Sequence, residues 1–155
     1  MQVRCWGARG SVPVSGEEYR HFGGDTTCVE VRGHDGQVVI IDAGTGIRRL
    51  GLHLQSERQA GINLLFTHAH WDHLMGFPFF QPLYESGRAI RIFGCSCAQD
   101  SVREMVSESM EPPHFPVSAG VICDNQMEDP SLGPLSIRIK APCLLLGRAD
   151  LHPRD

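Results

Sequence analysis

The sequence has no excess of positive charge. Its 14 Lys and Arg residues stand against 18 Asp and Glu residues, which gives a formal net charge of -4 at pH 7 and a pI near 6.0. A chain with this balance has no basic field that would attract nucleic acid over a long range, although a local patch could still contact it. The composition therefore gives no strong nucleic-acid signal.

Long apolar runs are also missing. No stretch approaches the roughly 20 residues that a membrane span needs, and the start, MQVRCWGARGSVPV, lacks the apolar segment and small-residue cleavage site of a signal peptide. We therefore expect a cytoplasmic protein with no membrane association. With 155 residues, 41% of them hydrophobic, the chain is long enough for one hydrophobic core, and we expect a single domain over residues 1–155.

The cysteines do not form a zinc-finger or disulfide pattern. There are six of them, but the chain is too long and too rich in apolar residues to resemble a disulfide-stapled miniprotein. Cys95 and Cys97 have no second pair at zinc-site spacing. We expect reduced thiols with a structural role.

What the sequence does contain is an alternation of strands and helices. Apolar and alternating runs predict strands at 2–6, 27–33, 37–44, 62–67, 89–94 and 135–141, and helical spacing predicts helices at 47–59 and 96–110. HDG at 34–36 predicts a hairpin turn, and the Gly- and Pro-rich stretch 7–25 predicts a long loop that is a candidate wall of a site. This order is typical of the α/β class.

One short stretch is unusually rich in histidine. THAHWDHLMGF, residues 67–77, follows a fully apolar strand and places His68, His70, Asp72 and His73 within six positions. His68 and His70 are two residues apart at the strand end, where alternation turns both side chains to one side and lets them share one metal ion. Asp72 and His73 follow where the chain must turn and are placed to reach a second ion.

These donors favour particular metals and a particular reaction. Imidazole and carboxylate together suit Zn²⁺ first, with Fe or Mn as alternatives, better than Ca²⁺ or Mg²⁺. Such a metal lowers the pKa of bound water to about 7, and two ions about 3.5 to 4 Å apart can hold the attacking and leaving oxygens. Hydrolysis follows as the expected reaction, with Asp72 as a catalytic residue that orients the water or ligates the second ion. No G-x-S-x-G elbow or P-loop competes with this interpretation.

The same stretch resembles a known family. FTHAHWDHLMGFPFF looks like the H-x-H-x-D-H signature of the metallo-β-lactamase-fold hydrolases, and WGARGSVPVSG, FGGDTTCVEV, IIDAGTGIRRLG and MEPPHFPV resemble flanking motifs of a branch close to ribonuclease Z and the cyclic phosphodiesterases. The resemblance implies an αββα sandwich with two zinc ions per site. It places His68 and His70 on the first ion, and Asp72 and His73 on the second. It also implies that Asp42 supports the metal loop by hydrogen bonds. The alternative, an Asx-type turn or helix cap before Gly44, is equally favoured.

The resemblance covers only the N-terminal part of the family's domain. Family members have in their second half another histidine, a bridging aspartate and a last histidine, and the sequence after the expected strand 135–141 offers only His152 as a candidate ligand. We therefore expect an αββα domain reduced to its N-terminal half. Half a sandwich leaves one sheet face without an opposing layer, which predicts a homo-oligomer.

Two hypotheses of function follow. In the first, the protein is a metal-dependent, phosphodiesterase-like hydrolase that uses metal-activated water on a small-molecule or nucleotide phosphodiester. In the second, it is a catalytically incomplete half-domain that serves as a metal-binding or self-associating module. The two hypotheses differ in whether the metal ligands of the family's second half are supplied.

Overall fold

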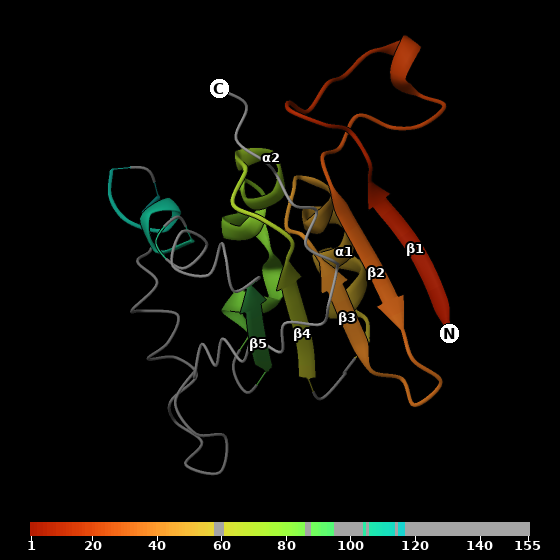
Figure 1. Cartoon of the computed structure of the whole chain (residues 1–155), viewed down its shortest axis with the longest axis vertical. Coiled ribbons are helices and arrows are strands. Elements are labelled where there is room, and N and C mark those ends of the chain that lie inside the picture. The colour runs from red at the N-terminus through yellow and green to blue at the C-terminus, as the bar shows by residue number, and fades with distance from the viewer. Residues whose placement is uncertain (58–60, 86–87, 95–103, 105, 114, 117–155) are drawn as a thin grey trace, which may run out of the picture.

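The structure is a computed structural model, and it describes residues 1–57, 61–85, 88–94, 104, 106–113 and 115–116. Five strands form one mixed sheet in the order β1-β2-β3-β4-β5. They are β1 (Gln2–Gly7), β2 (Cys28–Arg32), β3 (Val38–Ile41), β4 (Gly61–Phe66) and β5 (Ala89–Gly94). The first three strands are antiparallel neighbours, and β3, β4 and β5 run parallel. The predicted α/β class is confirmed (Figure 1).

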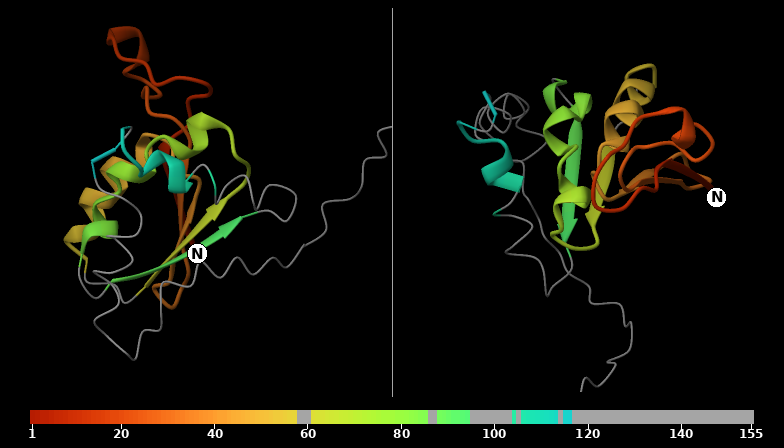
Figure 2. Two further views of the ribbon diagram at one scale, coloured as in Figure 1. Left: turned by 90° about the vertical axis from the view of Figure 1, so that its left-hand side faces the viewer. Right: turned by 90° about the horizontal axis from the view of Figure 1, so that it is seen from above.

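Helices connect the parallel strands on one face of the sheet. Helix α1 (Gly46–Gln55) links β3 to β4, and α2 (Trp71–Leu74) with the 3-10 turns η2 (Phe77–Phe79) and η3 (Gln81–Tyr84) leads from β4 to β5. Figure 2 shows these helices together on one side of the strands. Within the described part of the chain, no helix is long and apolar enough to cross a membrane. The cytoplasmic location stays a prediction.

The core lies between the sheet and α1. Helix α1 buries Ile47, Leu50 and Leu54 completely, and each such side chain contributes roughly 1.5–3 kcal/mol on leaving water. They pack above the alternate buried residues of the central strands, among them Ile40 and Leu64. The apolar runs predicted for the central strands are thus explained by their position.

Most predicted boundaries agree with the structure. The hairpin is present, with β2 and β3 antiparallel and Gly36 in the left-handed region at φ 81°. Helix α1 ends at Gln55 instead of residue 59. At this end, the hydroxyl of Ser56 donates to the carbonyl of His53 at 2.7 Å. In the predicted helix 96–110, the described residues 104 and 106–109 are helical, and the predicted strand 135–141 lies outside the described residues.

Strand β1 is present where the alternation predicted a strand, but its apolar side chains are not buried. Val3 is 60% exposed and Cys5 is exposed. The face toward α1 carries Arg4 and Trp6 instead. Arg4 lies opposite Glu30 of β2 in the antiparallel pairing.

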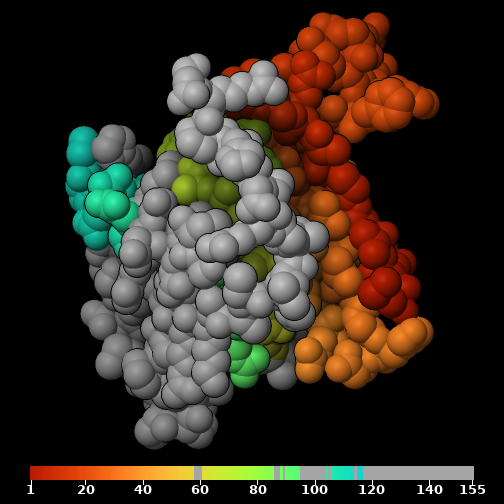
Figure 3. Space-filling model, in the orientation of Figure 1, coloured from red at the N-terminus to blue at the C-terminus, as the bar shows by residue number. Residues whose placement is uncertain are grey.

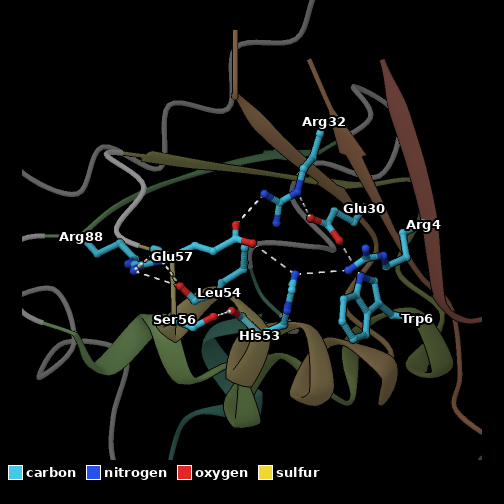
Figure 4. Close-up of polar contacts among 9 residues, drawn as sticks. All are labelled: Arg4, Trp6, Glu30, Arg32, His53, Leu54, Ser56, Glu57 and Arg88. Carbon is cyan, nitrogen blue, oxygen red and sulfur yellow. Dashed lines mark hydrogen bonds and ion pairs between the residues drawn. The ribbon is translucent and has the colours of Figure 1, made fainter. Parts of the chain in front are cut away.

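A polar cluster joins β1, β2 and the end of α1 (Figure 4). The carboxylate of Glu30, only 1% exposed, accepts hydrogen bonds from Trp6 Nε1 at 2.8 Å and from Arg32 Nε. Arg32 also donates to Glu57, and the indole of Trp6 lies 5.4 Å from the His53 ring. Because a buried carboxylate is stable only when paired and hydrogen-bonded, this cluster holds β1 against the helix.

A loop projects beyond the body next to β1. Residues 8–25, here called the arm loop, contain only the 3-10 turn η1 (Glu17–Tyr19) and stand out at one end of the molecule in Figures 1 and 3. Two backbone hydrogen bonds join its limbs, from Arg9 N to Asp25 O and from Val14 N to Gly24 O, both 3.0 Å. The loop predicted from its Gly and Pro content is present and internally braced.

Candidate metal centre

The histidine-rich stretch lies at the carboxyl end of the central strand β4. The strand ends at Phe66, His70 precedes α2 in an extended conformation, and Trp71–Leu74 form its single turn. Figure 1 shows α2 above the ends of β3 and β4. In open α/β sheets, sites are built at this edge because connecting loops gather there.

The structure brings all three histidine rings of the stretch together. The ring centroid of His68 lies 4.4 Å from that of His70 and 4.1 Å from that of His73. Asp72 Oδ2 lies 3.6 Å from His73 Nε2. Four of the five predicted ligands therefore share one small region, and the fifth, His152, lies outside the described residues.

The carboxylate of Asp42 orients the ring of His73. It is 2% exposed and follows β3, in the left-handed region at φ 62°, an uncommon conformation that aspartate tolerates better than most residues. Its Oδ2 is 2.8 Å from Nδ1 of His73, which donates to the carboxylate, so that Nε2 is the nitrogen left for an ion. Its oxygens also accept hydrogen bonds from the backbone N–H of Thr67 at 2.8 Å and from the Thr67 hydroxyl.

These contacts bear on the two interpretations offered for Asp42. A helix cap would place its carboxylate on the first turn of α1, but the residue before that helix is Thr45, and Asp42 contacts Thr67 and His73 instead. The carboxylate therefore supports the loop after β4.

Close backbone packing sets the height of this loop over the sheet. The His73 carbonyl accepts from Ala43 N at 2.7 Å, and Gly76 N donates to the Ala43 carbonyl at 2.8 Å. A Cβ on Gly76 would fall on the Gly44 carbonyl, and a Cβ on Gly44 would lie 2.5 Å from the Asp72 carbonyl oxygen. The two glycines are needed because any side chain there would push α2 away from the end of β3.

Asp72 is held from the other side by the arm loop. Its Oδ2 accepts a hydrogen bond from the backbone N–H of Ser11 at 2.8 Å. This hydrogen bond, with a smaller contribution from the charge of His73, lowers the pKa of Asp72 below its usual value despite the opposing effect of burial. Asp72 is thus an anion poised beside the histidines.

Sequence reasoning missed two of the groups that build this region. Thr67 could have been recognised from the sequence, since its hydroxyl directly precedes the first histidine and can donate to the buried carboxylate of Asp42. Ser11 carries none, because it acts through its backbone N–H and lies 61 residues from Asp72. Gly23 and Gly24 shape the arm loop: Gly23 has φ 79°, and Gly24 lies against the Val14 carbonyl.

The donor set fits a metal by its chemistry more than by its present arrangement. Three imidazoles and a carboxylate are the ligands of Zn²⁺, Fe and Mn²⁺ sites, and one imidazole is already oriented by a buried acid, as ligating histidines usually are. Among the residues that the structure describes, however, no three His, Cys, Asp or Glu side chains stand in positions that would hold an ion. The rings of His68, His70 and His73 lie against one another, so these side chains would have to rotate before they could hold an ion.

Comparison with known proteins agrees with this picture. Residues 21–86 match the sequence profile of the metallo-beta-lactamase superfamily. The N-terminal part of the chain carries the metallo-β-lactamase pattern. The superfamily resemblance drawn from the histidine motif is thereby confirmed, and the matched segment contains Asp42 and the whole histidine stretch.

A solved structure shares the metallo-β-lactamase-type fold. It is described as the crystal structure of a new diphosphatase from the PhnP family, and it superposes with a TM-score of 0.50 at 20% sequence identity. The match covers 70% of this chain and 46% of that one, so the chain spans less than half the length of its structural neighbour. No curated protein matches the sequence.

Proposed function

We propose that this protein is a metal-dependent hydrolase of the metallo-β-lactamase type that acts on phosphodiesters or related phosphate compounds. One observation carries the proposal: three histidines and Asp72 converge at the carboxyl end of β4, with His73 oriented by the buried Asp42. The superfamily match and the diphosphatase neighbour support hydrolysis at phosphorus.

Each residue has a defined task in this proposal. His68 and His70 would hold a first ion through ring nitrogens, and His73 with Asp72 would hold a second. A Zn²⁺, Fe or Mn²⁺ ion held there would lower the pKa of a bound water to about 7 and would polarise the phosphoryl group. Asp42 keeps the proton on Nδ1 of His73, so that Nε2 keeps its lone pair for the ion. Asp72 would ligate the second ion or orient the attacking water.

Hydrolysis of a phosphodiester tests the proposal. Purified protein loaded with Zn²⁺ or Mn²⁺ is incubated with bis(p-nitrophenyl) phosphate, and release of p-nitrophenolate is followed. We expect turnover that His70→Ala removes and that His34→Ala, a histidine in the hairpin turn, leaves unchanged. Turnover that survives His70→Ala would show that the activity does not come from this site.

A second candidate is a non-catalytic module that binds metal or associates with itself. It is favoured by the absence, within the described residues, of three donors already in position, and by exposed apolar side chains on several surfaces. Val3 is 60% exposed, Phe22 89% and Phe79 56%. A second copy that covers these surfaces would also be able to contribute further ligands, as would His152.

Turnover, measured together with the oligomeric state, separates the two candidates. The enzyme hypothesis expects metal-dependent turnover in whichever oligomer is present. The module hypothesis expects a homo-oligomer that binds metal without turnover. Light scattering after size exclusion, run with and without Zn²⁺, gives the oligomeric state in each case.

A further inference from the structure

We propose that Ser11 is a positioning residue of the metal centre, and that its backbone N–H links the arm loop, residues 8–25, to the binding of the ion. The inference rests on the proposed function, because it concerns the same site. It assigns to the loop a task beyond that of a passive wall.

The contact itself is direct. Ser11 N donates to Asp72 Oδ2 at 2.8 Å, although the two residues are 61 positions apart. Ser11 has φ 67°, in the left-handed region that residues other than glycine rarely adopt. Non-glycine residues keep such a conformation where the surrounding structure holds them in it, and such positions cluster at functional sites.

The rest of the arm loop is built to hold Ser11 in place. The hydrogen bonds from Arg9 to Asp25 and from Val14 to Gly24 close the loop on both sides of Ser11. The loop end is then fixed to α1 by a reciprocal pair: Thr26 N donates to Thr45 Oγ1 at 2.9 Å, and Thr45 N donates to Thr26 Oγ1 at 2.8 Å. These hydrogen bonds therefore fix the position of the Ser11 N–H relative to α1.

The amide fixes the direction of the Asp72 carboxylate. Oδ2 receives the Ser11 N–H and lies 3.6 Å from His73 Nε2, so the carboxylate is held beside the second-ion histidine. A ligating carboxylate that is itself hydrogen-bonded loses about 10- to 100-fold in metal affinity when that partner is removed. By linkage, an ion on Asp72 must stabilise the arm loop by the same factor.

Replacement of the amide by an ester tests the contact without changing a side chain. Cys28 allows ligation of a synthetic segment 1–27 to residues 28–155, and the Gly10–Ser11 amide in that segment is made as an ester. The matched control carries the ester at Pro13–Val14, which removes the Val14–Gly24 hydrogen bond of the same loop. Zn²⁺ and Co²⁺ affinities are measured by calorimetry on the refolded full chains.

We expect the Ser11 ester to weaken Zn²⁺ binding by about 10-fold or more. The Val14 ester removes one support of the loop but keeps the Ser11 N–H, and it should weaken binding less. Recombinant Ser11→Gly, which keeps the N–H and fits the left-handed backbone, should bind as the parent chain does, and Ser11→Pro should not. Equal affinities of the parent chain and the Ser11 ester would overturn the inference. A parent chain that binds no ion would instead remove the proposed function, and the inference with it.

Limited proteolysis gives a second measurement. Arg20 is exposed in the arm loop and is a trypsin site. Zn²⁺ should slow cleavage after Arg20 in the parent chain and in the Val14 ester, and have no effect in the Ser11 ester. Protection that is the same in all three chains would contradict the link through Ser11.

Discussion

The buried carboxylate of Asp42 and the imidazole of His73 are hydrogen-bonded at 2.8 Å across 31 residues of sequence. Asp42 directly follows β3, and His73 lies on α2, just beyond the neighbouring strand β4, so the bond connects two adjacent parallel strands at their carboxyl ends. It also selects Nε2 as the nitrogen of His73 that faces outward. Asp42→Asn keeps the shape and tolerates the left-handed backbone, but its NH₂ group cannot accept a hydrogen bond, and its single oxygen cannot replace both carboxylate oxygens toward His73 and Thr67.

We expect Asp42→Asn to weaken Zn²⁺ binding by about 10- to 100-fold and to lower the free energy of unfolding by about 1–3 kcal/mol. Calorimetry and urea unfolding measure the two effects. An Asn variant with parent-like metal affinity would show that Asp42 serves the fold alone.

Gly76→Ala should lower the free energy of unfolding by about 1–3 kcal/mol, because its Cβ would overlap the Gly44 carbonyl and force α2 to move. Gly10→Ala is the matched control, since nothing lies within 4 Å of a Cβ there. Urea unfolding followed by Trp fluorescence compares the two. Equal midpoints for both variants would contradict the close packing of the metal loop on β3.

Glu30→Ala should lower the free energy of unfolding by about 1–3 kcal/mol, because it removes the acceptor of the Trp6 N–H and one of the two carboxylate partners of Arg32. Glu18→Ala, an exposed residue of the arm loop, should have no measurable effect. Thermal unfolding followed by circular dichroism measures both. A small loss for Glu30→Ala would mean that the cluster in Figure 4 does not hold β1 in place.

Alkylation should distinguish the two described cysteines. Burial and the negative charges around it, that of Asp42 first among them, raise the pKa of the Cys28 thiol far above its usual value, whereas Cys5 is exposed. Because the thiolate is the reactive form, iodoacetamide at pH 8 should modify Cys5 in the native protein and Cys28 only after denaturation. Peptide mass mapping reports both, and rapid native labelling of Cys28 would contradict its burial.

The sequence predicted the parts of the site that depend on strand position. The apolar run of β4 followed directly by His68 and His70 placed the cluster at a strand end, and the structure has it there. The hairpin of β2 and β3 followed from two β-rich runs and an Asp-Gly turn. Both predictions depend only on residues that are neighbours in the sequence.

The parts that were missed depend on contacts between distant backbone segments. The Ser11 N–H, the approach of Gly76 to Gly44 and the pairing of Thr26 with Thr45 leave no periodicity in the sequence. Strand β1 was predicted correctly as a strand, but its alternation gave no sign that Trp6 and charged groups would fill the face toward α1.

The number of metal ions bound per chain tests the central claim most directly. Purified protein is saturated with Zn²⁺, freed of excess, and examined by native mass spectrometry beside the double variant His68→Ala, His73→Ala. The account predicts at least one ion per parent chain and none in the double variant. A parent chain without a bound ion, or a double variant that binds as many as the parent, would contradict it.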